Sequence, residues 1–329
     1  MSPIHLEFDL VKKVILHIGH GKTGTSAIQS FLALNFERLE REGIRYPEHP
    51  SFDAAKLGNI SSGNCPNEAE ALFALINSEL VRCPHDITLL FSNENMFWQR
   101  EKICFFIASL CEQVEFEIIL FIRDPIEMAN SVYHQTVKRS GETRPFEEVA
   151  VNESHILCAK QWHEALRDAG IKTTLVNYSK RKRSTVRAFL KALGCAEALQ
   201  EQKDAVAEYR IVNRSLGLME LNLVRIANRE FGKSAGHELS DRLVEISPNV
   251  KSHKFQASDE LLTNFKSRFG PTIAYFNEFL PEGEKLEIIG AEGEAEVPFA
   301  GNTDEEYAAV AAAFNVIMDE RNAARNERD

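Results

Sequence analysis

The sequence lacks features that several classes of protein require. No apolar run reaches the roughly 18 residues of a membrane-spanning helix, so no transmembrane segment is expected. The first residues show no basic stretch followed by an apolar core and a cleavage site, so no secretory signal is expected. Basic residues are too few to balance the acidic ones, 38 against 49, and the net charge of -11 argues against nonspecific binding to nucleic acid or anionic membranes.

Cysteine is also sparse, with six residues and no CxxC pair. In a chain of 329 residues this pattern indicates reduced, mostly buried thiols, not a disulfide framework or a zinc site, and no other metal-ligand cluster stands out. Hydrophobic residues make up 44% and charged residues 26%, which is typical of a globular protein with a deep core. We therefore expect a cytoplasmic protein.

Short apolar runs alternate with helical patterns over the first 200 residues. The patterns predict strands over 13–18, 86–92, 116–122 and 172–177, and helices over 25–41, 67–82, 99–113, 124–139, 154–169 and 184–193. This alternation predicts a three-layer α/β core with a mostly parallel central sheet. Beyond Gly194 only helices are predicted, over 214–231, 258–280 and 303–328. We expect a core over 1–200 and a mainly helical extension over 201–329, which packs on the core or belongs to the same domain.

A glycine-rich turn follows the first predicted strand. It reads LHIGHGKTGTS over 16–26, and a helix follows it. Glycines let the backbone N–H groups point inward, and the helix N-terminus and the lysine add positive charge, so the segment predicts a phosphate-binding loop. Leu16 stands where a Walker A motif needs glycine, so this is not that motif. The other interpretation is a plain strand–helix turn. A second GKS at 232–234 follows a helix and is interpreted as a helix end.

A second cationic position follows the third predicted strand. Arg123 lies at the carboxyl end of that strand, which is the usual ligand-binding edge of an α/β sheet. Asp124 and Pro125 predict a helix start, with Glu127 completing a capping box. Ser131 lies off the apolar stripe of this helix and can face the same ligand. The alternative is a local ion pair between Arg123 and Asp124 or Glu127.

These two segments together resemble the sulfotransferases that use 3′-phosphoadenosine 5′-phosphosulfate (PAPS), in particular their bacterial branch. The likeness covers about residues 13–195 and implies a P-loop-type fold. It implies that the 5′-phosphosulfate binds to Gly21, Lys22, Thr23, Gly24, Thr25 and Ser26. It also implies that Arg123 and Ser131 bind the 3′-phosphate and that Tyr178 lies near the adenine. Two features depart from the eukaryotic branch: Ala27 replaces an aromatic residue, and no clear C-terminal Arg-Lys-Gly segment is present.

The resemblance implies in-line sulfuryl transfer from PAPS to a hydroxyl acceptor, either a small molecule or a saccharide, without a metal. Lys22 would stabilise the leaving phosphate. We favour Glu94 as the base, and His20 is the reserve candidate; a surface acid at a helix entry and a backbone-bonded loop histidine are the respective alternatives. The basic residues over 180–183 either guide an acidic acceptor or the cofactor, or form a charged loop before a helix. Competing functions are a magnesium-dependent P-loop kinase or NTPase, with Asp124 as its metal-binding carboxylate, and a non-catalytic nucleotide-binding module. The oligomeric state stays open.

Overall fold

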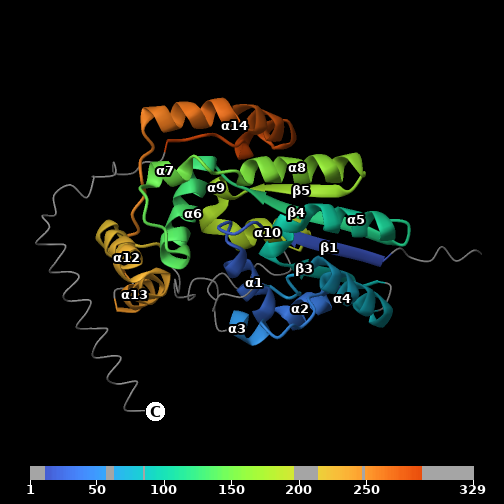
Figure 1. Cartoon of the computed structure of the whole chain (residues 1–329). Helices are drawn as coiled ribbons and strands as arrows, with labels where there is room; N and C mark the ends of the chain where they lie inside the picture. Colours follow the sequence, from blue (N-terminus) through green and yellow to red (C-terminus); the bar gives the residue numbers. More distant parts are fainter. Residues whose placement is uncertain (1–11, 57–62, 84–85, 196–213, 247–248, 291–329) are drawn as a thin grey trace, which may run out of the picture. The chain divides into compact units, whose positions relative to one another are not determined.

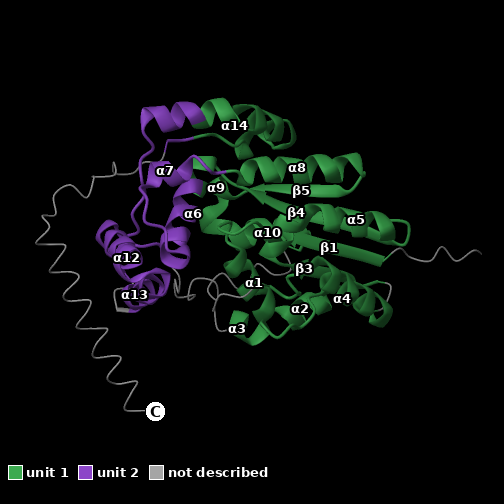
Figure 2. Ribbon diagram, in the orientation of Figure 1, with its two compact units in different colours: residues 1–128, 154–212, 265–288 green, residues 129–153, 213–264, 289–329 purple. Residues whose placement is uncertain are grey.

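The computed structural model describes residues 12–56, 63–83, 86–195, 214–246 and 249–290 (Figure 1). The chain divides into two compact units, which Figure 2 distinguishes by colour. The first comprises residues 1–128, 154–212 and 265–288, and the second comprises 129–153, 213–264 and 289–329. The predicted helix over 303–328 and the predicted domain boundary near residue 200 lie outside the described residues, so both stay predictions.

The first unit is built on a five-stranded parallel sheet. Its strands, in the spatial order β2-β3-β1-β4-β5, are β2 (Ile44–Arg45), β3 (Thr88–Ser92), β1 (Lys12–Ile18), β4 (Val114–Ile122) and β5 (Lys172–Asn177). The central strand β1 pairs with β3 through His17 and Ser92 and with β4 through Ile18 and Leu120. The predicted α/β class and parallel sheet are therefore confirmed. The apolar runs of β1, β3 and β4 are buried in the sheet, whereas β5 is buried only at Val176 and Asn177.

Helices cover the sheet in outer layers (Figure 1). Helices α1 (Thr25–Leu34), α3 (Phe52–Lys56) and α10 (Thr185–Leu193) share one apolar cluster with inward side chains of the strands, such as Ile15, Phe121 and Val176. Helix α8 (His155–Asp168) packs on β4 and β5, with α5 (Arg100–Leu110) beside it and α4 (Ala69–Arg82) beside α5. Burial of these apolar faces is the main force that holds the layers together.

Several short elements differ from the sequence prediction. The helix predicted over 25–41 ends at Leu34, and α2 (Phe36–Arg41) starts anew after Asn35, whose side chain donates to the Phe31 carbonyl at 2.8 Å. Strand β2 is too short to give a hydrophobic pattern. Other short elements are η1 (Glu94–Gln99), α7 (Phe146–Ala150), α9 (Tyr178–Arg181), η2 (Lys182–Ser184) and η3 (Glu282–Glu284).

The second unit is helical where it is described. It contains the part of α6 (Pro125–Ser140) from residue 129 onward, α7, α12 (Leu218–Phe231), α13 (Lys233–Ile246) and the start of α14 (Asp259–Phe279). Its aromatic core joins Tyr133, Phe146 and Phe255, whose ring centroids lie 5.0–5.6 Å apart. In the GKS segment, Gly232 ends α12 and α13 begins at once, which confirms the predicted helix end.

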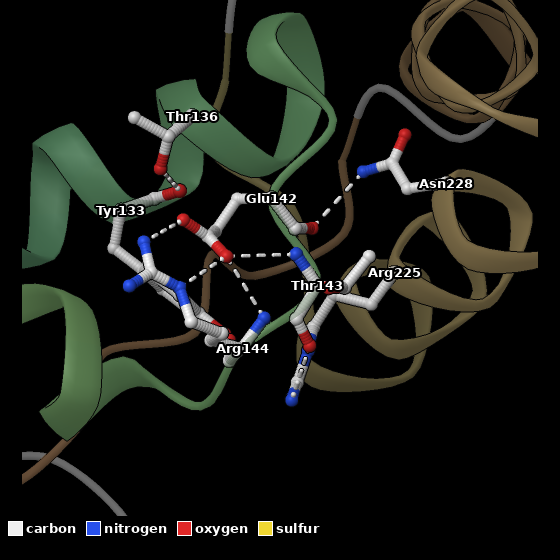
Figure 3. A network of polar contacts seen from close by, with 7 residues as sticks. All are labelled: Tyr133, Thr136, Glu142, Thr143, Arg144, Arg225 and Asn228. Atoms are coloured by element: carbon white, nitrogen blue, oxygen red, sulfur yellow. Dashed lines mark hydrogen bonds and ion pairs between the residues drawn. The ribbon is translucent and has the colours of Figure 1, made fainter.

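A polar turn joins α6 to α7 in this unit (Figure 3). The Glu142 carboxylate accepts hydrogen bonds from the backbone N–H groups of Thr143 and Arg144 and from the Arg144 guanidinium. The Arg144 side-chain bond lowers the pKa of Glu142 to about 2. Asn228 donates to the Glu142 carbonyl at 3.1 Å and to the Val137 carbonyl at 2.8 Å, so α12 is tied to the end of α6.

Candidate functional site

The carboxyl ends of four neighbouring strands carry the first-unit residues that the sequence singled out. The glycine-rich loop follows β1, Glu94 follows β3, Arg123 follows β4 and Tyr178 follows β5. Because all these strands are parallel, their carboxyl ends lie at one edge of the sheet. This is the edge at which open α/β sheets bind ligands.

The loop after β1 has the tight backbone that its glycines predicted. Lys22 has a φ of 73°, the one positive φ of a non-glycine residue in the described chain, and Gly24 has a φ of 78°. The Thr23 hydroxyl donates to the His20 carbonyl at 2.7 Å and so closes the loop on itself. Helix α1 starts at Thr25 with no acidic residue in its first turn, so the positive end of its dipole is not neutralised within that turn. A strained lysine at a helix N-terminus is typical of a functional loop.

Arg123 reaches the loop from the end of β4. Its Nη1 donates to the Lys22 carbonyl at 2.6 Å, and its guanidinium carbon lies 5.1 Å from the centre of the Tyr178 ring. Its Nε is buried and has no hydrogen-bond acceptor among the described residues, with the Glu127 carboxylate at 3.6 Å. The two positions that the sequence predicted as anion sites therefore adjoin each other, and the predicted local ion pair with Glu127 is also present.

Glu94 faces the loop from the other side. It is the first residue of η1, and its Oε2 accepts a hydrogen bond from the Thr25 hydroxyl at 3.3 Å. A Cβ atom placed on Gly21 would lie 3.5 Å from the same carboxylate oxygen. The structure thus brings a carboxylate, a lysine loop and an arginine together at one sheet edge. Such a set can bind an anion and accept a proton beside it.

The two histidines near the loop are buried. His20 lies against Phe97 and His155, with ring centroids 5.0 and 5.5 Å away, and burial lowers the pKa of His20 to about 3. His17 is buried between Phe121 and Phe189, and burial lowers its pKa to about 3 as well. Both imidazoles are therefore neutral near pH 7, and His20 is a much weaker proton acceptor than an ordinary histidine.

The other residues predicted to bind the cofactor differ in exposure and in the compact unit to which they belong. Ser26 is exposed on the first turn of α1, and the Thr25 hydroxyl is used by Glu94. Tyr178 is the first residue of α9, and burial raises the pKa of its hydroxyl. Ser131 lies on the part of α6 that belongs to the second unit, so its partnership with Arg123 stays a prediction.

The sequence did not predict the contacts that join Asp124 and Glu127 to the turn after β5 through Ser179. The capping box predicted for Glu127 is also absent from these contacts. Asp124 caps α6 by accepting from the Glu127 N–H at 2.9 Å, but the Asp124 N–H donates to the Ser179 hydroxyl. Glu127 instead accepts from Ser179 at 2.8 Å and pairs with Lys182. The basic run over 180–183 was the available signal, although its partner could not be read from the sequence.

The part of the chain that the structure describes carries neither a metal-binding cluster nor a membrane-spanning helix. No group of three or more His, Cys, Asp or Glu residues in this part of the chain is arranged to hold a metal ion. None of the described helices is both long enough and apolar enough to cross a bilayer.

Comparisons with known proteins give little beyond this geometry. No family model matches the sequence, and no curated protein matches it. Among solved structures, a similar chain is the crystal structure of a sulfotransferase from Alicyclobacillus acidocaldarius, which is 11% identical. The alignment covers 80% of this chain and 94% of that chain, with a TM-score of 0.38. The function is therefore argued from the residues of the site.

Proposed function

We propose that the protein is a PAPS-dependent sulfotransferase that transfers a sulfuryl group to a hydroxyl acceptor, for which a carbohydrate is one candidate. The observation that carries the proposal is the meeting of three groups at one sheet edge. The Lys22 loop binds the Arg123 guanidinium through its carbonyl at 2.6 Å and the Glu94 carboxylate through Thr25 at 3.3 Å. Cations beside a carboxylate suit a reaction in which a phosphate leaves and a hydroxyl loses its proton.

The residues present fit a doubly phosphorylated nucleotide. The loop offers backbone N–H groups and the positive end of α1 to one phosphate, and Lys22 adds a full charge. Arg123 adds a guanidinium charge beside the loop, 3.6 Å from the Glu127 carboxylate, and this is the cation that we assign to a second phosphate. Tyr178 presents a half-buried ring beside the guanidinium, which is suited to stacking on a base. These contacts support PAPS as the donor.

The proposed reaction is an in-line displacement at sulfur. The acceptor oxygen forms a bond to sulfur while the bond between sulfur and the bridging phosphate oxygen breaks, and adenosine 3′,5′-bisphosphate leaves with the electron pair. Lys22 stabilises the negative charge that grows on the leaving phosphate. Glu94 accepts the acceptor's proton at its carboxylate, and the protein supplies alignment through the loop and Arg123. The lysine and the loop amides provide the charge stabilisation that a metal would supply in a kinase.

Ligand binding and transfer test the proposal together. Thermal melting with adenosine 3′,5′-bisphosphate in EDTA is expected to show stabilisation, and Lys22→Ala and Arg123→Met are expected to remove it. Labelled PAPS offered to saccharides, lipids and phenols identifies the acceptor. With that acceptor, Glu94→Gln should keep the melting shift and lose transfer by about 100-fold or more. Glu101→Gln, an exposed acid on α5, is the matched control and should transfer normally.

The competing functions give different results in the same experiments. Stabilisation only by ATP with magnesium would refute the proposal in favour of a kinase or NTPase. Asp124 is already used as the cap of α6, which disfavours its role as a metal-binding carboxylate. Cofactor binding with no acceptor labelled across the whole screen would favour a non-catalytic nucleotide-binding module.

A further inference from the structure

A buried asparagine precedes Glu94 and fixes the turn that carries it. Asn93 is 1% exposed, and its Oδ1 accepts from the Asn95 N–H at 2.8 Å, which caps η1. Its Nδ2 donates to the Cys65 carbonyl at 2.9 Å, and to the Pro66 carbonyl and Asn67 Oδ1 at 3.2 Å each. One neutral side chain therefore ties the start of η1 to residues 63–67, which we call the 63–67 segment.

The 63–67 segment is itself fastened to the carboxyl end of β3. Asn64 is 1% exposed; its Oδ1 accepts from the Ser92 N–H at 2.8 Å and its Nδ2 donates to the Leu90 carbonyl at 3.0 Å. The Asn64 N–H donates to the Ser92 carbonyl at 3.2 Å. Strand β2 pairs with β3 only at Thr88 and Leu89, so the Asn64 bonds satisfy backbone groups of β3 beyond the last paired residue of β2.

The close approach of Gly63 shows how tightly the segment lies on the strand. A Cβ atom on Gly63 would lie 1.7 Å from the Ser92 carbonyl oxygen, so no larger residue fits there. The segment is therefore packed directly against the end of β3, the strand that leads to Glu94.

The geometry points to Asn93 as a positioning residue that holds the Glu94 carboxylate at the loop, acting through the 63–67 segment. This inference rests on the proposed role of Glu94 as the base. A glutamate has three side-chain torsions and η1 is a short 3₁₀ turn, so neither fixes the carboxylate by itself. A base must lie within hydrogen-bonding reach of the proton that it removes. Asn93 fixes the backbone from which the Glu94 side chain starts, so that the carboxylate stays within reach of Thr25, and it does so without placing a second charge beside Glu94.

A double-mutant cycle tests this role. Asn93→Ser keeps a cap for η1 and removes the amide that reaches the 63–67 segment. We expect kcat for sulfuryl transfer to fall about tenfold, with KM for PAPS changed less than twofold. In a Glu94→Gln background the same substitution should change kcat less than twofold, because there is no base left to position. Asn77→Ser, at an exposed asparagine of α4, is the matched control and should leave kcat unchanged.

A structural readout separates this inference from the proposed function. In a crystal structure of Asn93→Ser, the distance from Glu94 Oε2 to Thr25 Oγ1 should grow from 3.3 Å to beyond hydrogen-bonding reach. An unmoved carboxylate overturns the inference whether or not the protein transfers sulfate. Equal losses of kcat in both backgrounds also overturn it. Normal transfer by Glu94→Gln refutes the base and the positioning role together. If Asn93→Ser does not fold, the exposed Asn67→Ala removes one acceptor of the same amide and is read in the same way.

Discussion

Gly24, at the start of α1, offers a quantitative test of how the loop packs. It has a φ of 78°, and a Cβ atom there would lie 2.7 Å from Thr185 Cγ2 and 3.1 Å from Tyr178 Cε2. Gly24→Ala is therefore destabilised by two effects: the left-handed backbone, which disfavours a side chain, and steric crowding against Thr185 and Tyr178. Gly170 has a φ of 68° with nothing within 4 Å of the added Cβ, so only the left-handed backbone destabilises Gly170→Ala.

The difference between the two variants isolates the steric term. Both substitutions share the left-handed penalty of about 1–2 kcal/mol and the same gain from a less flexible unfolded chain. Crowding in a packed interior costs about 1–3 kcal/mol. Urea unfolding should therefore show that Gly24→Ala loses about 1–3 kcal/mol more free energy of unfolding than Gly170→Ala.

A second substitution identifies the atom responsible. Thr185→Ser removes the Cγ2 methyl and keeps the hydroxyl that donates to the Arg181 and Lys182 carbonyls at 3.1 Å. In the Gly24→Ala background it should restore about 1 kcal/mol or more, whereas in the wild type it should be neutral or destabilising. Equal losses for Gly24→Ala and Gly170→Ala, within about 0.5 kcal/mol, would show that the loop does not pack on Thr185 and Tyr178 as described.

Two further predictions concern the same loop and the strand before it. Since Lys22 has a φ of 73°, Lys22→Gly should be about 1 kcal/mol more stable than Lys22→Ala in urea unfolding, and both should lack transfer; a less stable glycine variant would contradict the strained backbone. The pKa of His17 is lowered to about 3 in the folded protein and returns to about 6.5 on unfolding. Between these two pH values the unfolded state binds a proton at His17 and the folded state does not. Stability should therefore fall as the pH drops below 6.5. His17→Asn should reduce the loss between pH 7 and pH 5 by about 2 kcal/mol, and an unchanged pH dependence of the urea midpoint would show that His17 is not buried and neutral.

The central strands of the fold could be predicted because they are continuous apolar runs bounded by turns. Strand β4, with residues 116–122 apolar but for Glu117, is buried along almost its whole length, and that pattern has no competing interpretation. Strand β2 and the turn η1 left no such pattern, because two residues or one polar turn give no periodicity. The break at Asn35 left no signal in the sequence, because asparagine is also found inside helices.

The candidate site likewise has features that the sequence predicts and others that depend on contacts between distant residues. The parallel sheet predicted from the sequence puts the Lys22 loop and Arg123 at one edge, because the carboxyl ends of parallel strands share it. Their direct contact also needs β1 and β4 to be neighbours, and this strand order was not predicted from the sequence. The Glu127 bond to Ser179 joins residues 52 positions apart, and the bond between Asn93 and Cys65 spans 28 positions. Neither has a local signal, because hydrogen bonds between distant polar residues depend on where the chain folds and not on spacing.

The order of the strands also gives the proposed reaction a direction along the sheet edge. Following β3, β1, β4 and β5, the edge carries Glu94, then Lys22, then Arg123, then Tyr178. Neighbouring strands lie about 4.8 Å apart, so the ends of β3 and β5 are three strand spacings apart, and the strands that carry Lys22 and Arg123 lie between them. In the proposed reaction, the base and the acceptor lie on one side of the leaving phosphate and the adenosine lies on the other, because an in-line displacement needs attacking and leaving oxygens on opposite sides of the sulfur. Under this proposal the acceptor hydroxyl approaches from the side of β3 and η1, and the adenine lies toward Tyr178.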